Sequence, residues 1–219
     1  LLSYSQTKEF MKNTGRNSLL VDRAEEFHQE IDNLDPSNYE VETYNFVGCG
    51  TPTLDKIFVL NKEAGGDVEY NISFTNGDGT VPVKSAEAIP SIKTYYLNNA
   101  IHALMPSTTG VKEAIVSILK GKDVDLEFYT NLSESKSGCD MPDGKIVSFH
   151  SPIDLHVYQG SEHTGPLPNG DIEYGIPELA YEIIDWNKFV FLPDDNDYEV
   201  KGSATGEGTF DAKIEEIRN

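Results

Sequence analysis

The stretch Asn76-Gly77-Asp78-Gly79-Thr80-Val81-Pro82 decides how the first half of the chain is interpreted. It follows closely on Val68 to Phe74, a run rich in β-branched and aromatic residues that predicts a strand. His102 has a similar setting, in a loop that follows a second predicted strand, Lys93 to Leu97. Open α/β sheets carry their sites at the carboxyl ends of strands, so Asp78 and His102 are candidate site residues.

The other elements of the first half are predicted from apolar periodicity and turn residues. An amphipathic helix covers Ser18 to Leu34, with Asn17 or Ser18 as its N-cap and Asp35-Pro36 at its end. A hairpin joins Lys56–Leu60 to the strand at Val68 through the turn Ala64-Gly65-Gly66-Asp67. The remaining elements are a strand over Glu40–Val47, a short helix over Ser85–Ile89 and a helix over Val111–Lys120 that Gly121 terminates.

The second half has a different character, which places a domain boundary near residue 122, between 1–122 and 123–219. Its strands are short and separated by Gly, Pro, Asn and Asp, a spacing typical of a β-sandwich. We expect them at Leu126–Thr130, Lys145–Phe149, Asp154–Tyr158, Phe189–Leu192, Tyr198–Lys201 and Thr209–Ile214, with Glu178–Asp185 ambiguous. The predicted fold class is therefore α/β in the first half, followed by an all-β, sandwich-like domain.

Composition and charge exclude several classes of protein. The 219 residues include 17 Lys and Arg against 37 Asp and Glu, a formal net charge of −20. Such a surface repels phosphate backbones and anionic headgroups, so no nucleic-acid partner is expected. No run of about 18 apolar residues predicts a transmembrane helix. The two cysteines, Cys49 and Cys139, form one disulfide at most, which excludes a disulfide scaffold without defining the redox compartment.

The residue types of the first half suit acid–base catalysis. In a Ser-His-Asp triad the aspartate orients the histidine and stabilises the imidazolium, and the histidine takes and returns the proton of the nucleophile. Asp-Gly pairs are also common in turns, and a lone histidine is usually a satisfied loop or core residue. The pairing of Asp78 with His102, their order and their strand context favour the acid–base interpretation.

The same segments resemble a family of lipid-acting α/β-hydrolases. Asn76 to Pro82, with Ser85-Ala86 just after it, resembles the acid loop of enzymes similar to lecithin–cholesterol acyltransferase and phospholipid:diacylglycerol acyltransferase. Tyr44 to Thr53 resembles the segment before that loop, Ile101 to Met105 the histidine segment, and Val111 to Lys120 the closing helix. The resemblance covers about residues 1–121. It implies a lipase, esterase or acyltransferase acting on lipid or other carboxylic esters, with Asp78 and His102 catalytic; no cofactor or metal is expected.

The chain departs from that family at the nucleophile. In α/β-hydrolases the serine precedes the acid and the histidine and lies in a Gly-x-Ser-x-Gly elbow. No such motif occurs here, and the nearest imitation, Ser137-Gly138-Cys139, follows His102. We therefore expect the nucleophile and oxyanion hole to precede Leu1 and the chain alone to be inactive as an esterase. The missing N-terminal fragment or a second copy would cover the open sheet edge, with Leu1, Leu2 and the helix at Ser18 as candidate contacts.

Other candidate residues have a favoured structural interpretation. Cys49 lies between two glycines but is interpreted as a buried structural cysteine, and Ser85 and Ser107 as helix caps. His150, Asp154 and His156 share strand parity and are zinc-binding types, although Pro152 interrupts the strand and a solvated face is favoured. Asp194-Asp195-Asn196-Asp197 has calcium-binding types but reads as a solvated turn. His163 is expected in an exposed loop and His28 on the solvent flank of its helix.

A competing function is a non-catalytic hydrolase remnant that binds a protein or a glycan through its sandwich. The aromatic candidates for a sugar platform are Tyr158, Tyr174, Tyr181 and Trp186. The second half also resembles modules of bacterial surface or secreted proteins, through Tyr198-Glu199-Val200-Lys201 and Gly206-Glu207-Gly208-Thr209-Phe210. That resemblance implies a secreted or cell-envelope protein.

Overall fold

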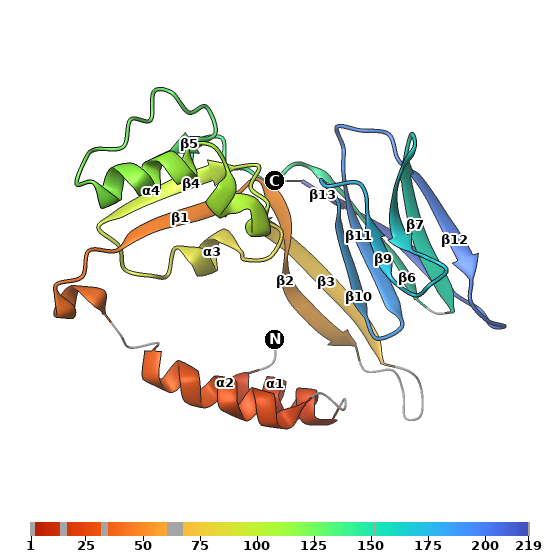
Figure 1. Ribbon diagram of the computed structural model, residues 1–219. Helices are drawn as coiled ribbons and strands as arrows, with labels where there is room; N and C mark the ends of the chain where they lie inside the picture. The colour runs from red at the N-terminus through yellow and green to blue at the C-terminus, as the bar shows by residue number, and fades with distance from the viewer. Residues whose placement is uncertain (1–2, 14–16, 32–34, 61–67, 151, 219) are drawn as a thin grey trace. The chain divides into compact units, whose positions relative to one another are not determined.

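The computed structural model describes residues 3–13, 17–31, 35–60, 68–150 and 152–218 (Figure 1). The chain forms two compact units, 1–43 and 44–219. The first contains helices α1 (Tyr4–Asn13) and α2 (Ser18–Ile31) and the 3₁₀ turn η1 (Pro36–Tyr39). Asn17 caps α2 as predicted, because its Oδ1 accepts the backbone N–H of Leu19 at 3.1 Å. The predicted end of this helix, residues 32–34, lies outside the described residues.

A three-stranded sheet organises the first part of the second unit. Strands β1 (Tyr44–Cys49) and β4 (Lys93–Asn98) run parallel, and the short β5 (Leu132–Ser133) pairs antiparallel with β4. The order is β1-β4-β5, so β4 is the one neighbour of β1 among the described strands.

A helix packs on each face of this sheet. On one face, Tyr95 and Leu97 of β4 form a buried cluster with Val111 and Ala114 of α4 (Val111–Leu119). On the other face, Val47 and Cys49 of β1 cluster with Val83 of the short helix α3 (Val83–Ala86). The predicted α/β pattern of alternating strand and helix is therefore present locally, in a chain that is otherwise mostly β.

A long hairpin and a disulfide join this sheet to the rest of the unit. Strands β2 (Thr51–Leu60) and β3 (Glu69–Gly77) form the predicted hairpin, whose turn at 64–67 lies outside the described residues. Phe74 of β3 contacts Phe191 edge to face, with ring centroids 5.8 Å apart. Cys49, at the end of β1, is bonded to Cys139, 90 residues later in the sequence.

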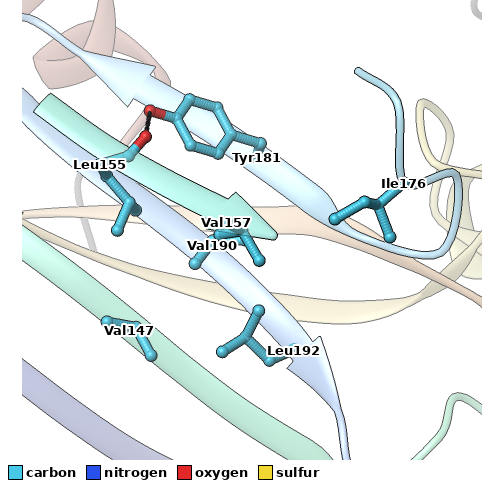
Figure 2. Close-up of a cluster of buried hydrophobic side chains, with 7 residues drawn as sticks. All are labelled: Val147, Leu155, Val157, Ile176, Tyr181, Val190 and Leu192. Atoms are coloured by element: carbon cyan, nitrogen blue, oxygen red, sulfur yellow. Dashed lines mark hydrogen bonds between the residues drawn. The ribbon is translucent and has the colours of Figure 1, made fainter. Parts of the chain in front are cut away.

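Two four-stranded antiparallel sheets make up the remainder of this unit. One has the order β10-β11-β6-β13 and the other β12-β7-β8-β9. Their bounds are β6 Gly144–His150, β7 Ile153–Gln159, β8 Glu162–Pro166, β9 Ile172–Tyr174, β10 Ala180–Ile184, β11 Asn187–Pro193, β12 Glu199–Ala204 and β13 Asp211–Ile217. They share one core, to which both contribute alternate apolar side chains: Val147, Leu155, Val157, Ile176, Tyr181, Val190 and Leu192 (Figure 2). This is the sandwich arrangement expected from the spacing of the strands.

The structure corrects several predicted elements. Leu126–Thr130 is not a strand, because Leu126 and Tyr129 pack beside the α4 cluster in an irregular segment. Glu178–Asp185 contains strand β10. Strand β8 was missed because Gly165 and Pro166 interrupt its alternation, and β9 because it is only 3 residues long. Helix α1 was also missed, and α3 lies at Val83–Ala86 instead of Ser85–Ile89. The boundary near 122 stays a prediction, although β5 and Cys139 attach later residues to the first sheet.

No helix within the described ranges is long and apolar enough to cross a bilayer.

Candidate active site

Asp78 lies where strand β3 ends, and the turn that follows holds its carboxylate in place. Its Oδ1 accepts the backbone N–H groups of Thr80 at 3.0 Å and Val81 at 2.7 Å. Gly79 has a φ of +87°, which glycine adopts without strain, so the chain can turn back over the carboxylate. The Asp78 side chain is 6% exposed. The local sequence Gly-Asp-Gly-Thr-Val therefore builds a buried acceptor with one oxygen bound by the backbone.

Glycines also allow close approach of the strands around this turn. A Cβ at Gly48 of β1 would lie 2.5 Å from the Cβ of Asp78, and one at Gly77 would lie 2.4 Å from the Thr53 hydroxyl. Both distances are shorter than van der Waals contact. The turn fits against β1 and β2 because these two positions have no side chain.

His102 is placed by a backbone and a side-chain contact to the same aspartate. Its N–H donates to the Asp78 carbonyl at 3.0 Å, at the start of the 3₁₀ turn η2 (His102–Ser107). Its Nδ1 lies 2.8 Å from Asp78 Oδ2. An ionised carboxylate only accepts hydrogen bonds, so Nδ1 carries the proton and the lone pair is on Nε2. The structure thus brings together the two residues that the sequence paired.

The imidazole borders a pocket of about 370 Å³. The His102 side chain is 50% exposed, whereas its aspartate partner is buried. The pocket is lined mainly by apolar side chains of β1, α3, η2 and α4, together with the dyad: Phe46, Gly48, Asp78, Val81, Ala86, His102, Met105, Pro106, Val111 and Ile115. An oriented base beside an apolar pocket suits proton transfer to a bound, largely apolar substrate.

No described serine or cysteine side chain is hydrogen-bonded to Nε2 of His102. Cys49 and Cys139, the cysteine of the Ser137-Gly138-Cys139 imitation, are bonded to each other, so neither is a free thiol. The Ser107 hydroxyl donates to the Leu104 carbonyl at 2.9 Å. The dyad therefore has no nucleophile partner in the part of the chain that the structure describes.

Ser85 and Ser107 are not the helix caps that we expected. Ser85 lies inside α3, whose N-cap is Pro82. Helix α4 begins after Gly110, whose N–H donates to Glu113 Oε2 at 2.7 Å. A glycine with φ +96° and the returning glutamate satisfy the start of α4 without a hydroxyl.

The residues singled out for zinc do not converge. Nδ1 of His150, on β6, lies within hydrogen-bonding distance of the Asn187 carboxamide, whereas Asp154 and His156 belong to β7 in the other sheet. The parity argument failed because the chain changes sheets between His150 and Ile153. His156 instead meets His163, which lies in β8 and not in an exposed loop. Within the described ranges no group of three or more His, Cys, Asp or Glu side chains is arranged to hold a metal ion.

The remaining candidates are also placed by the structure. Asp194 pairs with Lys145 at 2.7 Å and with Arg218, and these cations lower the pKa of its carboxyl. Tyr181 is buried and its hydroxyl donates to the Leu155 carbonyl at 2.8 Å, so it is no sugar platform (Figure 2). Trp186 is 71% exposed, and His28 is exposed on α2 as expected.

Sequence reasoning missed two residues that support the acid loop. The buried Thr53 hydroxyl accepts the Gly79 N–H at 2.9 Å and donates to the Thr51 carbonyl. Asn76 Oδ1 accepts the Gly50 N–H at 2.7 Å, and its amide nitrogen donates to the Cys139 carbonyl. The signal for both was weak, because polar residues at strand ends usually face water.

Comparison with known proteins adds no relative: no protein-family model, curated protein or solved structure matches this chain.

Proposed function

We propose that Asp78 and His102 are the acid and base of an acyl-transfer site for lipid or other carboxylic esters. The nucleophilic serine would come from a segment outside residues 1–219. The observation that carries the proposal is the 2.8 Å contact between His102 Nδ1 and Asp78 Oδ2 beside an apolar pocket. A buried aspartate on Nδ1 presents Nε2 as the base, which is the arrangement that activates a serine hydroxyl.

The hydrogen bonds support a separate role for each of the two residues. Asp78 has one oxygen bound by two backbone N–H groups and the other directed at the imidazole, so its orientation is established before substrate binds. His102 would take the serine proton during attack and return it to the leaving alcohol. Water or an alcohol would then accept the acyl group, giving hydrolysis or transfer.

The pocket supports a substrate that places an apolar acyl or alkyl group beside Asp78 and His102. Phe46, Met105 and Ile115 contribute apolar side chains to its lining. Ile101 and Leu104 are exposed on either side of His102 and extend the apolar surface. A strongly charged substrate would lose hydration at such a site without a compensating ion pair.

The β1 side of the sheet is where we place the segment that would carry the nucleophile. Among the described strands β1 is hydrogen-bonded to β4 alone, and we infer that a further strand would pair along its other edge. A strand added there would lie beside β1, whose residues Phe46 and Gly48 line the pocket. This is where a nucleophile carried by a further strand would be supplied.

The first test is to sequence the gene upstream of the codon for Leu1. The proposal expects that region to encode a Gly-x-Ser-x-Gly motif directly after a predicted strand. The product of the complete reading frame should hydrolyse p-nitrophenyl butyrate and be labelled by a fluorophosphonate. Asp78→Asn and His102→Ala should each lower kcat by about 10⁴-fold or more. His28→Ala, at an exposed histidine on α2, is the matched control and should leave turnover unchanged.

Two results would contradict the proposal. One is a complete gene product that lacks an elbow and any fluorophosphonate-reactive serine. The other is ester turnover that survives His102→Ala in a folded protein. In addition, the 219-residue chain alone should hydrolyse the ester no faster than its Asp78→Asn, His102→Ala double variant.

A second candidate function is glycan or protein binding by the sandwich. The observation that favours it is the exposure of two aromatic side chains in this region, Trp186 and Tyr174. Titration of the chain with oligosaccharides should then change the fluorescence of Trp186, the one tryptophan in the sequence. No change with any oligosaccharide would remove the support for glycan binding.

The disulfide bears on where either function would operate. Cys49–Cys139 joins two buried cysteines. Structural disulfides persist in oxidising compartments, so this bond supports the proposal that the protein is secreted or works in the cell envelope.

A further inference from the structure

Residues 48–51, with the sequence Gly-Cys-Gly-Thr, join strand β1 to strand β2, and we call them the template segment. Gly48, Cys49 and Gly50 are buried. The segment contacts both Asp78 and the residues that lead into His102. Its contacts are made by backbone atoms, a disulfide and one hydroxyl group.

The template segment touches the acid directly. Gly48 lies so close to Asp78 that a Cβ at position 48 would be 2.5 Å from the Asp78 Cβ. Thr51 and Asp78 also pair as an isolated parallel β-bridge. These contacts set the position of the Asp78 backbone relative to the end of β1.

The same segment holds the residue two positions before His102. The Ala100 N–H donates to the Cys49 carbonyl at 3.2 Å, and the Ala100 carbonyl accepts the Thr51 hydroxyl at 2.8 Å. Both backbone hydrogen-bonding groups of Ala100 are therefore satisfied by the template segment. Because one residue separates Ala100 from His102, these bonds also restrict where the histidine can lie.

A disulfide and a carboxamide anchor the template segment itself. Cys49 is bonded to Cys139, and the Gly50 N–H donates to Asn76 Oδ1 at 2.7 Å. The Asn76 amide nitrogen also donates to the Cys139 carbonyl, so the carboxamide joins the two anchors. Asn76 lies two residues before Asp78 in the acid loop. The disulfide, the carboxamide and the acid loop therefore form one connected network.

The imidazole of His102 depends on this backbone network for its placement. Its side chain is 50% exposed, so packing around the ring constrains it little. The 2.8 Å hydrogen bond to Asp78 therefore requires that both backbones are correctly placed. A misplacement of about 1 Å can cost about 10²-fold in the rate of an enzyme.

We propose that Thr51 and Asn76 are positioning residues for the dyad and act through the template segment. The Thr51 hydroxyl holds the backbone before His102, and the Asn76 carboxamide ties the segment to the disulfide. Their loss should weaken the hydrogen bond of the dyad without removing either of its members. The consequence for ester turnover rests on the proposed function, whereas the effect on the dyad hydrogen bond is independent of it.

The first readout is the tautomer of His102, measured from its side-chain nitrogen-15 shifts at high pH in the full chain. An ionised aspartate that accepts the Nδ1 proton favours the Nδ1–H tautomer. Thr51→Val and Asn76→Leu should each lower the ratio of the Nδ1–H to the Nε2–H tautomer by about fivefold, the equivalent of one net hydrogen bond. Thr51→Ser keeps the hydroxyl and should retain the wild-type ratio.

The matched control is Thr164→Val in the sandwich. Thr164 is buried, and its hydroxyl accepts the Ile176 N–H at 3.1 Å. This variant also loses a hydrogen bond to the backbone and should leave the His102 tautomer unchanged. In the product of the complete reading frame, Thr51→Val should lower kcat by about 10- to 100-fold with KM close to that of the wild type, and Thr164→Val should alter neither.

Hydrogen exchange of the wild-type chain tests the network without a substitution. The amides of Gly50 and Ala100 donate within the network, and those of Thr80 and Val81 donate to Asp78. All four amides should be protected and should lose protection together as urea is added, as members of one cooperative unit. This measurement decides the proposal where a variant does not fold.

Three results would overturn the proposal. They are an unchanged tautomer ratio in folded Thr51→Val and Asn76→Leu, an equal change in Thr164→Val, and fast exchange of the Gly50 and Ala100 amides in the wild type. A dyad that responds as expected, in a complete protein without esterase activity, would refute the proposed function and support the positioning role.

Discussion

Removing the Cys49–Cys139 disulfide should cost a large part of the stability of residues 44–219. The bond joins cysteines separated by 90 residues. In the chain-entropy model, closing a loop of this length removes about 4.6 kcal/mol of freedom from the unfolded chain at 25 °C. Domains are stable by roughly 5–15 kcal/mol in total, so this term is comparable with the whole. Both cysteines are buried, so substitution by alanine also removes packing.

The assay is urea unfolding followed by circular dichroism, on the wild type and on the Cys49→Ala, Cys139→Ala double variant. We expect the free energy of unfolding to fall by about 4–6 kcal/mol in the variant. A reductant should destabilise the wild type toward the variant and leave the variant itself unchanged. A loss below about 1 kcal/mol in the variant, or equal sensitivity of both proteins to reductant, would refute the reasoning.

Three further predictions follow from individual contacts. In nitrogen-15 spectra at high pH, His102 should be the Nδ1–H tautomer. Asp78→Ala should shift it toward the Nε2–H tautomer, because the acceptor of the Nδ1 proton is lost. An unchanged tautomer in the variant would contradict the 2.8 Å contact between His102 Nδ1 and Asp78 Oδ2. Gly48→Ala should destabilise the protein by about 1–3 kcal/mol in thermal unfolding, because its Cβ would meet Asp78 at 2.5 Å, whereas Gly206→Ala has 3.7 Å of room and should be close to neutral. Burial lowers the pKa of His156, so the unfolded chain binds more protons than the folded chain between that lowered pKa and 6.5. The free energy of unfolding should therefore rise with pH through this window. His156→Gln should flatten that rise, and an identical slope in both proteins would argue against the prediction.

The pairing of Asp78 with His102 illustrates what local sequence predicts well. Asp78 follows strand β3 directly and His102 follows strand β4 after a short loop, as the sequence predicts, although these two strands belong to different sheets and not to one open sheet. The Gly-Asp-Gly turn and the helix Val111–Leu119 depend on backbone preferences and periodicity within a few residues. Such features are encoded where they occur, so the sequence alone determined them.

The histidines of the sandwich illustrate the opposite case. Parity along one strand predicted that His150 and His156 share a face, but the chain changes sheets between them. His156 meets His163 and Glu173 because β7, β8 and β9 are adjacent, with the registers Tyr158 opposite His163 and Gly165 opposite Glu173. Register depends on cross-strand packing and turn geometry, which single-strand periodicity does not contain.

The sequence by itself determined the pairing of Asp78 with His102, helices α2 and α4 and the strand-rich second half, because these follow from patterns a few residues long. Tertiary structure alone decided the Cys49–Cys139 bond, the pocket beside His102 and the meeting of His156 with His163. Each of these joins strands or loops that are brought together only when apolar faces pack against each other. Their energies arise from burial and cross-strand contact, which no local stretch of residues specifies.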